Sequence, residues 1–368
     1  MRILILNVGS ATLKYAVFSK EKLVFKNILY YGKRTPHKTL PKALGKVMAE
    51  LKRKKISVEA VGHRVVHGGS IKNSQKITSK LIRQLQRFIE LAPLHNIPEL
   101  YAIQFCKKKF PVPQIAIFDT AFHQTMPEKA YTYAIPRRLG KQYQIRRYGF
   151  HGMSHQHVAV EACRKLRWNR KKKKLITCHL GNGCSIAAIQ NGRSMDTSMG
   201  FTPLEGLVMG TRSGDIDPGA LLYLMHKKKL SVKKAEHLLN QQSGLLAISG
   251  ISSDMGTLLK SRRERAKLAI EIFCYRLAKY IAGYIAVLGG ADAVIFTGGI
   301  GEHAWQIRKK VMEYFRFYGI TLDSGGNREN ALLISGKSSK VKVLVIPTNE
   351  ELMMVREVRT ILGKRGKG

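Results

Sequence analysis

The sequence is poor in acidic residues: 24 aspartates and glutamates stand against 64 lysines and arginines, a formal net charge of +40. It also lacks a long apolar run. Ile3–Leu6 is too short for the core of a signal peptide, and glycines and an aspartate interrupt the stretch 280–296, so no membrane span is expected. The five cysteines form no C-x-x-C pair. These absences predict a cytoplasmic protein with reduced thiols.

The basic residues are scattered rather than gathered. An excess of this size attracts nucleic acid and other polyanions. However, there is no long basic tail, and no basic block is interleaved with aromatic residues. The runs are short: Lys52–Lys55, Lys107–Lys109, Arg170–Lys174 and Lys227–Lys229. This pattern favours a solvated basic surface, and no dedicated nucleic-acid site is expected.

Short apolar segments rich in β-branched residues alternate with helical patterns, which predicts an α/β architecture with hairpins and crossover helices. The length of 368 residues allows two domains. We expect their boundary near Thr120–Pro127, with the last helix, Glu350–Leu362, packing back on the first domain. The expected strands are Ile3–Leu6, Tyr15–Phe18, Val61–Val66, Gln114–Phe118, Leu175–Cys178, Ile186–Ile189, Ala293–Phe296 and Val341–Ile346. The expected helices are Leu40–Lys52, Ser79–Leu91, His155–Leu166, Gly219–His226, Ser231–Asn240, Arg265–Val287 and His303–Tyr318.

Two strand–turn–strand segments resemble each other, LNVGSATLKYAVFSK from Leu6 and HLGNGCSIAAIQNGR from His179. An offset of 172 residues places Gly9 on Gly181 and Ser10 on Asn182. One such unit in each half predicts a duplicated architecture whose two turns face a common ligand.

The first turn offers groups that bind phosphate: glycine admits close approach, hydroxyls and backbone N–H groups donate, and lysine adds a charge. The residues are Asn7, Gly9, Ser10, Thr12 and Lys14, and the amide of Asn7 can also ligate Mg²⁺. A plain β-hairpin is the alternative interpretation of this turn.

A third glycine-rich segment, FTGGIGEH at 296–303, follows an expected strand and precedes an expected helix. This arrangement would place backbone donors at a helix N-terminus, suited to a nucleotide phosphate or to contact with adenosine. Its spacing fits neither the dinucleotide fingerprint nor the Walker P-loop. The glycine-rich turns therefore predict a different nucleotide cradle.

Two arginines lie in glycine-flanked settings that suit bidentate capture of a carboxylate or phosphate, Arg64 in VGHRVVHGG and Arg212 in MGTRSGDIDPG. The alternative for each is a structural ion pair, for example Arg212 with Asp215. Asp119 ends an expected strand, and His151 occupies a glycine turn before a helix.

A zinc site at His151, His155 and His157 is not favoured, because no H-E-x-x-H pattern or cysteine partner accompanies them. We interpret His155 and His157 as polar residues at a helix N-terminus. The inventory instead suits phosphoryl transfer, in which positive donors stabilise charge spread over the phosphoryl oxygens. Arg64, Arg212, His151 and Mg²⁺ would supply that charge, and Glu350 could hold the metal through water.

Together these motifs resemble the acetate kinase family of the acetate/sugar kinase, Hsp70 and actin superfamily. The matching segments are NVGSATLKY, GHRVVHGG, LAPLHN, FDTAFHQTMP, YGFHGMSH, HLGNGCSIAAIQNGRSMDTSMGFTPLEGLVMGTRSGDIDPG, SGLLAISGISSDM, FTGGIGE and PTNEEL. The resemblance implies a two-domain actin-like ATPase (ribonuclease H-like) fold with duplicated βββαβα cores. It also implies an acyl-substrate and phosphate lobe, 1–121 with 349–368, and a nucleotide-binding lobe, 122–348.

The resemblance further implies reversible, in-line transfer of a phosphoryl group from ATP to acetate, with Mg²⁺ or Mn²⁺, in a homodimer. The implied active-site residues are Asp119, His151 and Arg212, and Asn7 and Glu350 serve the metal. Arg64 binds the carboxylate, and the acyl pocket is formed by Val66, Leu94, Phe150 and Pro203. The nucleotide-binding residues are Ser10, Thr12, Lys14, His179, Leu180, Gly181, Asn182, Gly183, Asp254, Met255, Gly256, Gly299, Ile300, Gly301, Glu302 and His303.

Three positions depart from the family pattern: Thr12 replaces a usual serine, Gly256 a usual arginine, and His303 a usual asparagine. The chain is also shorter than typical members. We expect an active enzyme with an altered nucleotide preference. The alternatives are a kinase for propionate or another short-chain acid, and an inactive member that binds nucleotide or nucleic acid.

Overall fold

The computed structural model describes residues 1–9, 11–32, 36–89 and 93–363, without the side chains of 36–38 and 93–95. The chain forms two compact units. Unit 1 comprises Met1–Gln124 and Asn349–Gly368, and unit 2 comprises Thr125–Thr348.

Unit 1 is built on a mixed sheet with the strand order β3-β2-β1-β4-β6-β5. Strands β1 to β3 form an antiparallel meander, whereas β1, β4 and β6 run parallel. The strands are β1 (Arg2–Val8), β2 (Thr12–Ser19), β3 (Lys22–Tyr30), β4 (Ala60–Val65), β5 (Gln75–Lys76) and β6 (Gln114–Phe118). The helices are α1 (Pro36–Arg53), α2 (Ser79–Gln86), α3 (Pro93–Lys109) and α15 (Glu350–Gly363).

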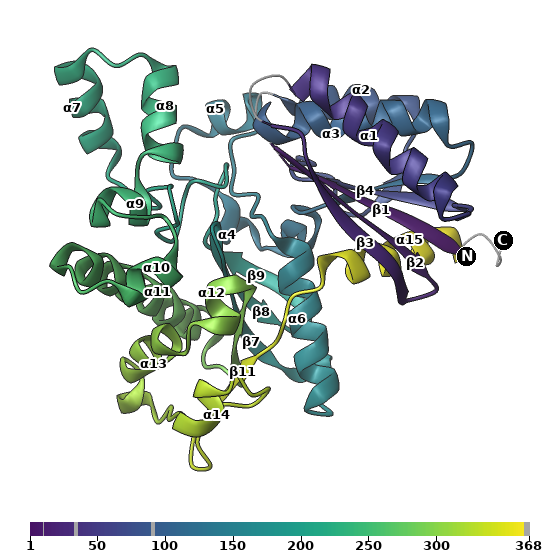
Figure 1. Cartoon of the computed structure of the whole chain (residues 1–368). Helices are drawn as coiled ribbons and strands as arrows, with labels where there is room; N and C mark the ends of the chain where they lie inside the picture. The colour runs from purple at the N-terminus through teal and green to yellow at the C-terminus, as the bar shows by residue number, and fades with distance from the viewer. Residues whose placement is uncertain (10, 33–35, 90–92, 364–368) are drawn as a thin grey trace. The chain divides into compact units, whose positions relative to one another are not determined.

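Helices cover both faces of the unit 1 sheet, with α1 and α3 on one face and α15 on the other (Figure 1). Side chains that alternate along β1 explain this arrangement. Leu4 and Leu6 belong to the core cluster that includes the residues of α1 and α3. On the other face, a Cβ atom at Gly62 would contact both Ile5 and Val358 of α15. The two buried faces therefore fix the sheet between helices.

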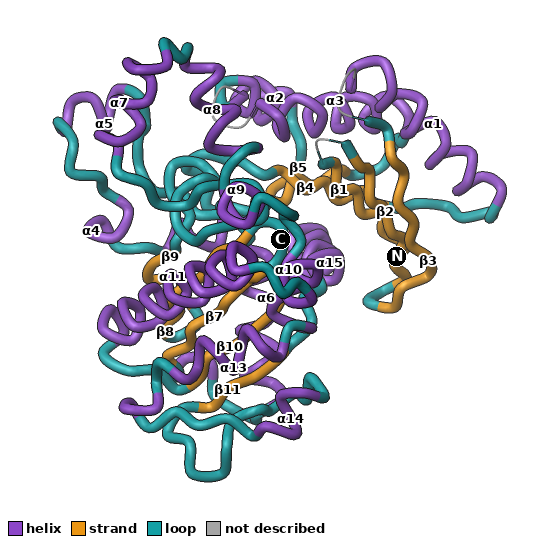
Figure 2. The backbone as a smooth tube through the Cα atoms, turned by 60° about the vertical axis from the view of Figure 1, so that its left-hand side comes forward, coloured by secondary structure: helices purple, strands orange, loops and turns teal. Residues whose placement is uncertain are grey.

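Unit 2 repeats this order of strands as β9-β8-β7-β10-β11. Its strands are β7 (Lys174–Leu180), β8 (Cys184–Gln190), β9 (Arg193–Thr197), β10 (Ala293–Thr297) and β11 (Lys342–Val345). Helices α6 and α11 contact this sheet (Figure 2). The helices are α4 (Glu128–Tyr131), α5 (Arg137–Gln142), α6 (Gly152–Lys165), α7 (Pro218–Lys228), α8 (Val232–Gln241), α9 (Gly244–Ser249), α10 (Met255–Lys260), α11 (Glu264–Leu288), α12 (Gly298–His303), α13 (Trp305–Glu313) and α14 (Ser324–Arg328).

The predicted α/β class and its duplication are confirmed, since β1, β4 and β6 of unit 1 correspond in sheet position to β7, β10 and β11 of unit 2. The segment FTGGIGEH follows strand β10 and precedes helix α13, as predicted, but residues 298–303 also form a short helix of their own, α12. The helix expected from His303 begins at Trp305, and the helix expected to reach Leu91 ends at Gln86.

The five cysteines are buried and form no disulfide among the described residues. Within the same part of the chain, no helix has the length and apolarity that a membrane crossing requires. Two basic runs lie in the last turns of α1 and α3, which precede the parallel strands β4 and β6. Those charges therefore gather where these parallel strands begin, at the edge of the sheet opposite to the ends of the strands.

Candidate functional site

Unit 1 brings three predicted residues together at the carboxyl ends of its parallel strands. Asn7 lies at the end of β1, Arg64 near the end of β4 and Asp119 just after β6. Nε of Arg64 donates to Oδ1 of Asp119 at 3.0 Å, and Nη2 donates to Oδ2 at 2.5 Å. Nη1 of Arg64 donates to Oδ1 of Asn7 at 3.0 Å. The guanidinium is thus held by a bidentate ion pair and an amide.

The neighbourhood of this ion pair is buried and strongly charged. Burial alone would lower the pKa of Arg64, but the carboxylates of Asp119 and Glu350 raise it above its ordinary value. Glu99 of α3 is 2% exposed, and its Oε2 accepts a hydrogen bond of 3.0 Å from the N–H of Val66. Burial raises the pKa of Glu99 to about 8, although the Val66 N–H and Arg64 oppose this shift. The sequence analysis missed Glu99, which lies on a helix that it did not predict.

The first glycine turn joins β1 to β2. The N–H of Gly9 donates to the carbonyl of Thr12 at 2.7 Å, and the hydroxyl of Tyr31 donates to the carbonyl of Gly9. Lys14 is exposed and lies opposite Asn7 in the antiparallel register, so both side chains project from one face of the hairpin. Ser10 lies outside the described residues. Of the predicted acyl pocket, Val66 is buried, whereas the side chain of Leu94 lies outside the described residues.

The second glycine turn joins β7 to β8 in unit 2. The N–H of Gly181 donates to the carbonyl of Gly183 at 3.1 Å, and the N–H of Gly210 donates to the carbonyl of Asn182 at 3.1 Å. His179 and Leu180 end β7, and Leu180 is buried. The turn is therefore closed on itself and tied to the segment that carries Arg212.

His151 and Arg212 converge beside this turn. A Cβ atom at Gly183 would lie 3.5 Å from Nη1 of Arg212 and 3.6 Å from Nε2 of His151. The ring of His151 stacks on that of His179 at a centroid distance of 4.3 Å. His151 is also the N-cap of α6 and has a φ of 55°, in the left-handed region. Because Gly183 has no side chain, Nη1 of Arg212 and Nε2 of His151 border the position that a side chain would fill.

Arg212 has no carboxylate ion-pair partner among the described residues. Its Nη1 donates to the carbonyl of Pro203 at 3.0 Å and contacts Sδ of Met209 at 3.4 Å. Burial lowers the pKa of Arg212. The alternative of an ion pair with Asp215 is wrong, because Asp215 accepts from the N–H of Gly206 at 2.7 Å and from the hydroxyl of Tyr280 at 2.6 Å.

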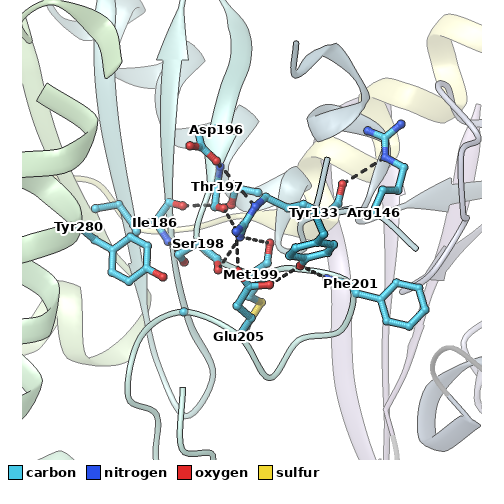
Figure 3. Close-up of polar contacts among 12 residues, drawn as sticks. Tyr133, Arg146, Ile186, Asp196, Thr197, Ser198, Met199, Phe201, Glu205 and Tyr280 are labelled. Atoms are coloured by element: carbon cyan, nitrogen blue, oxygen red, sulfur yellow. Dashed lines mark hydrogen bonds and ion pairs between the residues drawn. The ribbon is translucent and has the colours of Figure 1, made fainter. Parts of the chain in front are cut away.

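A polar cluster that the sequence analysis missed holds the loop that carries Pro203 (Figure 3). Glu205 accepts from the hydroxyl of Tyr133, and from Nη2 of Arg147 at 2.5 Å. Nη1 of Arg147 donates to the carbonyls of residues 197, 198 and 199, where β9 ends. The arginine just before the YGFHGMSH motif was the available signal. The cluster fixes both ends of the segment between β9 and Glu205.

The remaining predicted nucleotide segments begin short helices. Asp254 is the N-cap of α10 and accepts from the N–H of Thr257 at 2.7 Å; Met255 and Gly256 follow it, and only Met255 is buried. In α12, which holds residues 299–303, Oε1 of Glu302 accepts from the N–H groups of Gly298 and Thr348 at 2.8 and 3.1 Å. This carboxylate thus occupies the N–H of Gly298, the first backbone donor of α12.

Three further residues of unit 2 that the sequence analysis discussed are buried. Phe150, predicted for the acyl pocket, is 1% exposed. His155 and His157, interpreted as polar residues at a helix N-terminus, lie in the first half of α6 and are buried. No group of three or more His, Cys, Asp or Glu residues within the described ranges could hold a metal ion.

Two units with one sheet order, each ending its central strand in a glycine turn, define the actin-like ATPase (ribonuclease H-like) fold class. The chain belongs to the Acetokinase family, whose profile matches residues 31–356.

Proteins with reviewed sequences and solved structures agree with this assignment. An acetate kinase of Halothermothrix orenii is 47% identical, covering 98% of this chain and all of that protein. The crystal structure of an acetate kinase from Porphyromonas gingivalis has a TM-score of 0.88 at 39% identity, covering 98% of this chain and 99% of that one. A propionate kinase from Francisella tularensis has a TM-score of 0.89 at 40% identity, covering 97% and 98%.

Proposed function

We propose that the chain catalyses reversible, Mg²⁺-dependent transfer of the γ-phosphoryl group of ATP to acetate, giving acetyl phosphate and ADP by direct in-line transfer. One observation carries the proposal: Arg212, which has no carboxylate ion-pair partner among the described residues, lies with Nε2 of His151 beside the Cβ position of Gly183. Positioned donors of this kind stabilise the charge that develops on a transferring phosphoryl group. Relatives named acetate kinase that match the whole chain support the choice of acceptor.

Unit 1 would bind the acceptor. Arg64 suits a carboxylate because its planar fork can hold two oxygens, and Asp119 already engages that fork in the structure. Since acetate is ionised at neutral pH, Asp119 acts by positioning Arg64 and the substrate rather than as a strong base. Val66 and Leu94 of this unit would contact the methyl group.

The metal would be held by the amide oxygen of Asn7 and, through water, by the carboxylate of Glu350. Both groups are hard oxygen donors, and Mg²⁺ usually takes one or two protein oxygens beside water and phosphate. The electrostatic effect of Glu350 on Arg64 indicates that this carboxylate lies near the guanidinium that binds Asn7. When bound, Mg²⁺ would neutralise charge on the phosphates, which Lys14, Ser10 and Thr12 also contact.

The nucleotide would be bound by the turn at 179–183, by the start of α10 and by α12. We expect a changed preference among donors, because Gly256 offers no side chain at the exposed start of α10. ATP, GTP and inorganic pyrophosphate should be compared as donors, with Gly256→Arg as the matched variant. A gain in kcat/KM for ATP over pyrophosphate in this variant supports the assignment; equal use of all donors by both proteins contradicts it.

The decisive test is formation of acyl phosphate, trapped as the hydroxamate, with acetate and propionate compared by kcat/KM. A rival candidate is an inactive member of the family that binds polyanions through its basic surface. Binding to heparin or DNA that weakens steeply with salt, together with no hydroxamate from either acid, would favour that rival.

We also infer a homodimer, and a cytoplasmic location that suits five buried, free cysteines. The homodimer is supported by helix α7, none of whose residues is buried. Two of its large apolar side chains, Leu222 and Tyr223, are 65% and 62% exposed. Apolar faces of this kind usually contact a partner, and a second copy is the family expectation. Light scattering should give twice the chain mass, and Leu222→Glu should lower it; a wild-type monomer at micromolar concentration would contradict the inference.

A further inference from the structure

A chain of hydrogen bonds connects three buried side chains of unit 2 to the half-buried side chain of His151. Nδ1 of His151 lies 2.8 Å from Oγ of Ser185, and the same oxygen lies 2.7 Å from Nε2 of His155. Nδ1 of His155 in turn lies 2.7 Å from Oγ1 of Thr177. Ser185, His155 and Thr177 are each 0% exposed. Neighbouring strands β7 and β8 supply the two hydroxyls, and α6 supplies the two imidazoles.

Only one direction of hydrogen bonding satisfies every group in this chain. A neutral imidazole donates from one nitrogen and accepts at the other, and a hydroxyl has one proton to donate. Within the described residues, Nδ1 of His155 is the one hydrogen-bond partner of the Thr177 hydroxyl. If Thr177 only accepted, its buried O–H would lack an acceptor, at a cost of about 1–3 kcal/mol. Thr177 must therefore donate to His155.

The remaining protons follow from this first step. His155 carries its proton on Nε2 and donates it to the oxygen of Ser185. The hydroxyl of Ser185 then donates to Nδ1 of His151, so the proton of a neutral His151 ring resides on Nε2. This is the nitrogen that lies beside Arg212 over Gly183. Stacking on His179 holds the plane of the same ring.

We propose that Thr177, His155 and Ser185 are positioning residues that keep the proton of His151 on Nε2, where it is donated to the transferring phosphoryl group. The inference rests on the proposed function, which assigns His151 to that group. In the opposite tautomer a lone pair would face the phosphoryl oxygens, and the stabilising hydrogen bond would become a repulsion. A histidine held in the wrong tautomer can retain its geometry and lose most of its effect on the rate.

The test compares Thr177→Val, which keeps the shape of the side chain but deletes the first donor, with Thr177→Ser, which keeps the donor. Long-range ¹H–¹⁵N spectra of ¹⁵N-histidine-labelled protein report the tautomer of each ring; the signals of His151 are those lost in His151→Gln. We expect the Nε2–H form in the wild type and in Thr177→Ser. In Thr177→Val the Nδ1–H form should appear, and kcat should fall about 10-fold with the KM for acetate within about two-fold.

Ser185→Ala breaks the chain next to His151 and should lower kcat by at least as much. Its matched control is Ser198→Ala, which removes another buried hydroxyl just after β9; that hydroxyl accepts from the N–H of Ile186. A wild-type His151 in the Nδ1–H form, or a spectrum unchanged in Thr177→Val and Ser185→Ala, overturns the proposal. Because the tautomer is read without turnover, a wild type that forms no acyl phosphate but shows these spectral changes would refute the proposed reaction and support the chain.

Discussion

The two predicted site arginines, Arg64 in unit 1 and Arg212 in unit 2, differ in how their charge is balanced. In unit 1, Arg64 is 17% exposed and forms a bidentate ion pair with Asp119 and a third bond to Asn7. In unit 2, Arg212 contacts a carbonyl and a thioether, with no carboxylate ion pair among the described residues. The pKa of Arg64 is raised by its acidic neighbours, whereas burial lowers that of Arg212. The first cation is neutralised before any substrate binds; the second is not.

This difference implies a division between stability and rate. A buried charge that has lost its partner is strongly destabilising, so Arg64 is tied to the folding of unit 1 through Asp119. Among the described residues, Arg212 has no carboxylate partner that its loss would strand, and its electrostatic attraction is left for an incoming anion. Four predictions test this comparison.

The largest effect is expected for Arg212→Ala. Loss of the cation should lower kcat about 10³-fold with little change in the KM for acetate, because we propose that its charge acts on the transferring group. The free energy of unfolding should change by less than about 1 kcal/mol. Steady-state kinetics and urea unfolding measure both quantities. Arg212→Lys keeps the charge and should recover part of kcat; a large rise in KM with unchanged kcat would make Arg212 a binding residue instead.

Arg64→Ala should have the opposite balance of effects, with a large loss of stability and a rise in the KM for acetate. The carboxylate of Asp119, 1% exposed, would lose its cation, and we expect the free energy of unfolding to fall by about 3 kcal/mol. The KM for acetate should rise about 10²-fold, since the proposed contact of the guanidinium with the substrate carboxylate would be lost. The double variant Arg64→Ala with Asp119→Ala is the control, because it removes the stranded charge. If the double variant is no more stable than Arg64→Ala, the ion pair is not the source of the loss.

A smaller effect is expected for Gly183→Ala. The added Cβ would make contacts of 3.5 Å, the ordinary van der Waals distance, so the fold should tolerate it. The methyl group would nevertheless occupy the point that Arg212 and His151 border, and kcat should fall about 10- to 100-fold. Gly283→Ala, a position in α11 where a Cβ meets nothing within 4 Å, is the matched control. Full activity in Gly183→Ala would separate this space from the reaction.

The smallest effect concerns pH and Glu99. The unfolded chain releases this proton near pH 4.5, whereas the folded unit 1 retains it up to about pH 8. Between these values the native state binds more protons, so the free energy of unfolding should decrease with rising pH, by about 1.4 kcal/mol per pH unit at most. Glu99→Gln should flatten that slope in urea titrations, and Glu264→Gln, with its 84% exposed side chain, should not. An unchanged slope in Glu99→Gln would contradict the assignment.

The sequence predicted the elements whose patterns are local. Apolar runs that end in glycine or a polar residue marked β1, β4, β6, β7 and β10, and the ends of these strands carry most of the candidate site. Strand β3 was missed because only one of its faces is partly covered, so its apolar residues do not form a continuous run. Helix α3 was missed because it contains Pro98 and lacks a clear apolar face.

The sequence did not predict which side chains become partners in the folded protein. Arg64 and Asp119 were each identified, but their pairing depends on the register of β4 with β6, which joins residues 55 positions apart. Glu99 and Ser185 carry no local signal, since an isolated glutamate or serine is common on any helix or strand. Their importance follows from burial and from the groups that face them.

The place of α15 has a consequence for how this polypeptide reaches its native state. The ribosome makes all of Thr125–Thr348 before it makes α15, yet α15 covers one face of the unit 1 sheet. The nascent first 124 residues must therefore wait, with Ile5 and Ile117 uncovered, until more than 200 further residues have been added. A chain that stops at Thr348 would lack Glu350, and one face of the unit 1 sheet would stay exposed to solvent. Premature termination would therefore yield an aggregating product rather than a weakened catalyst.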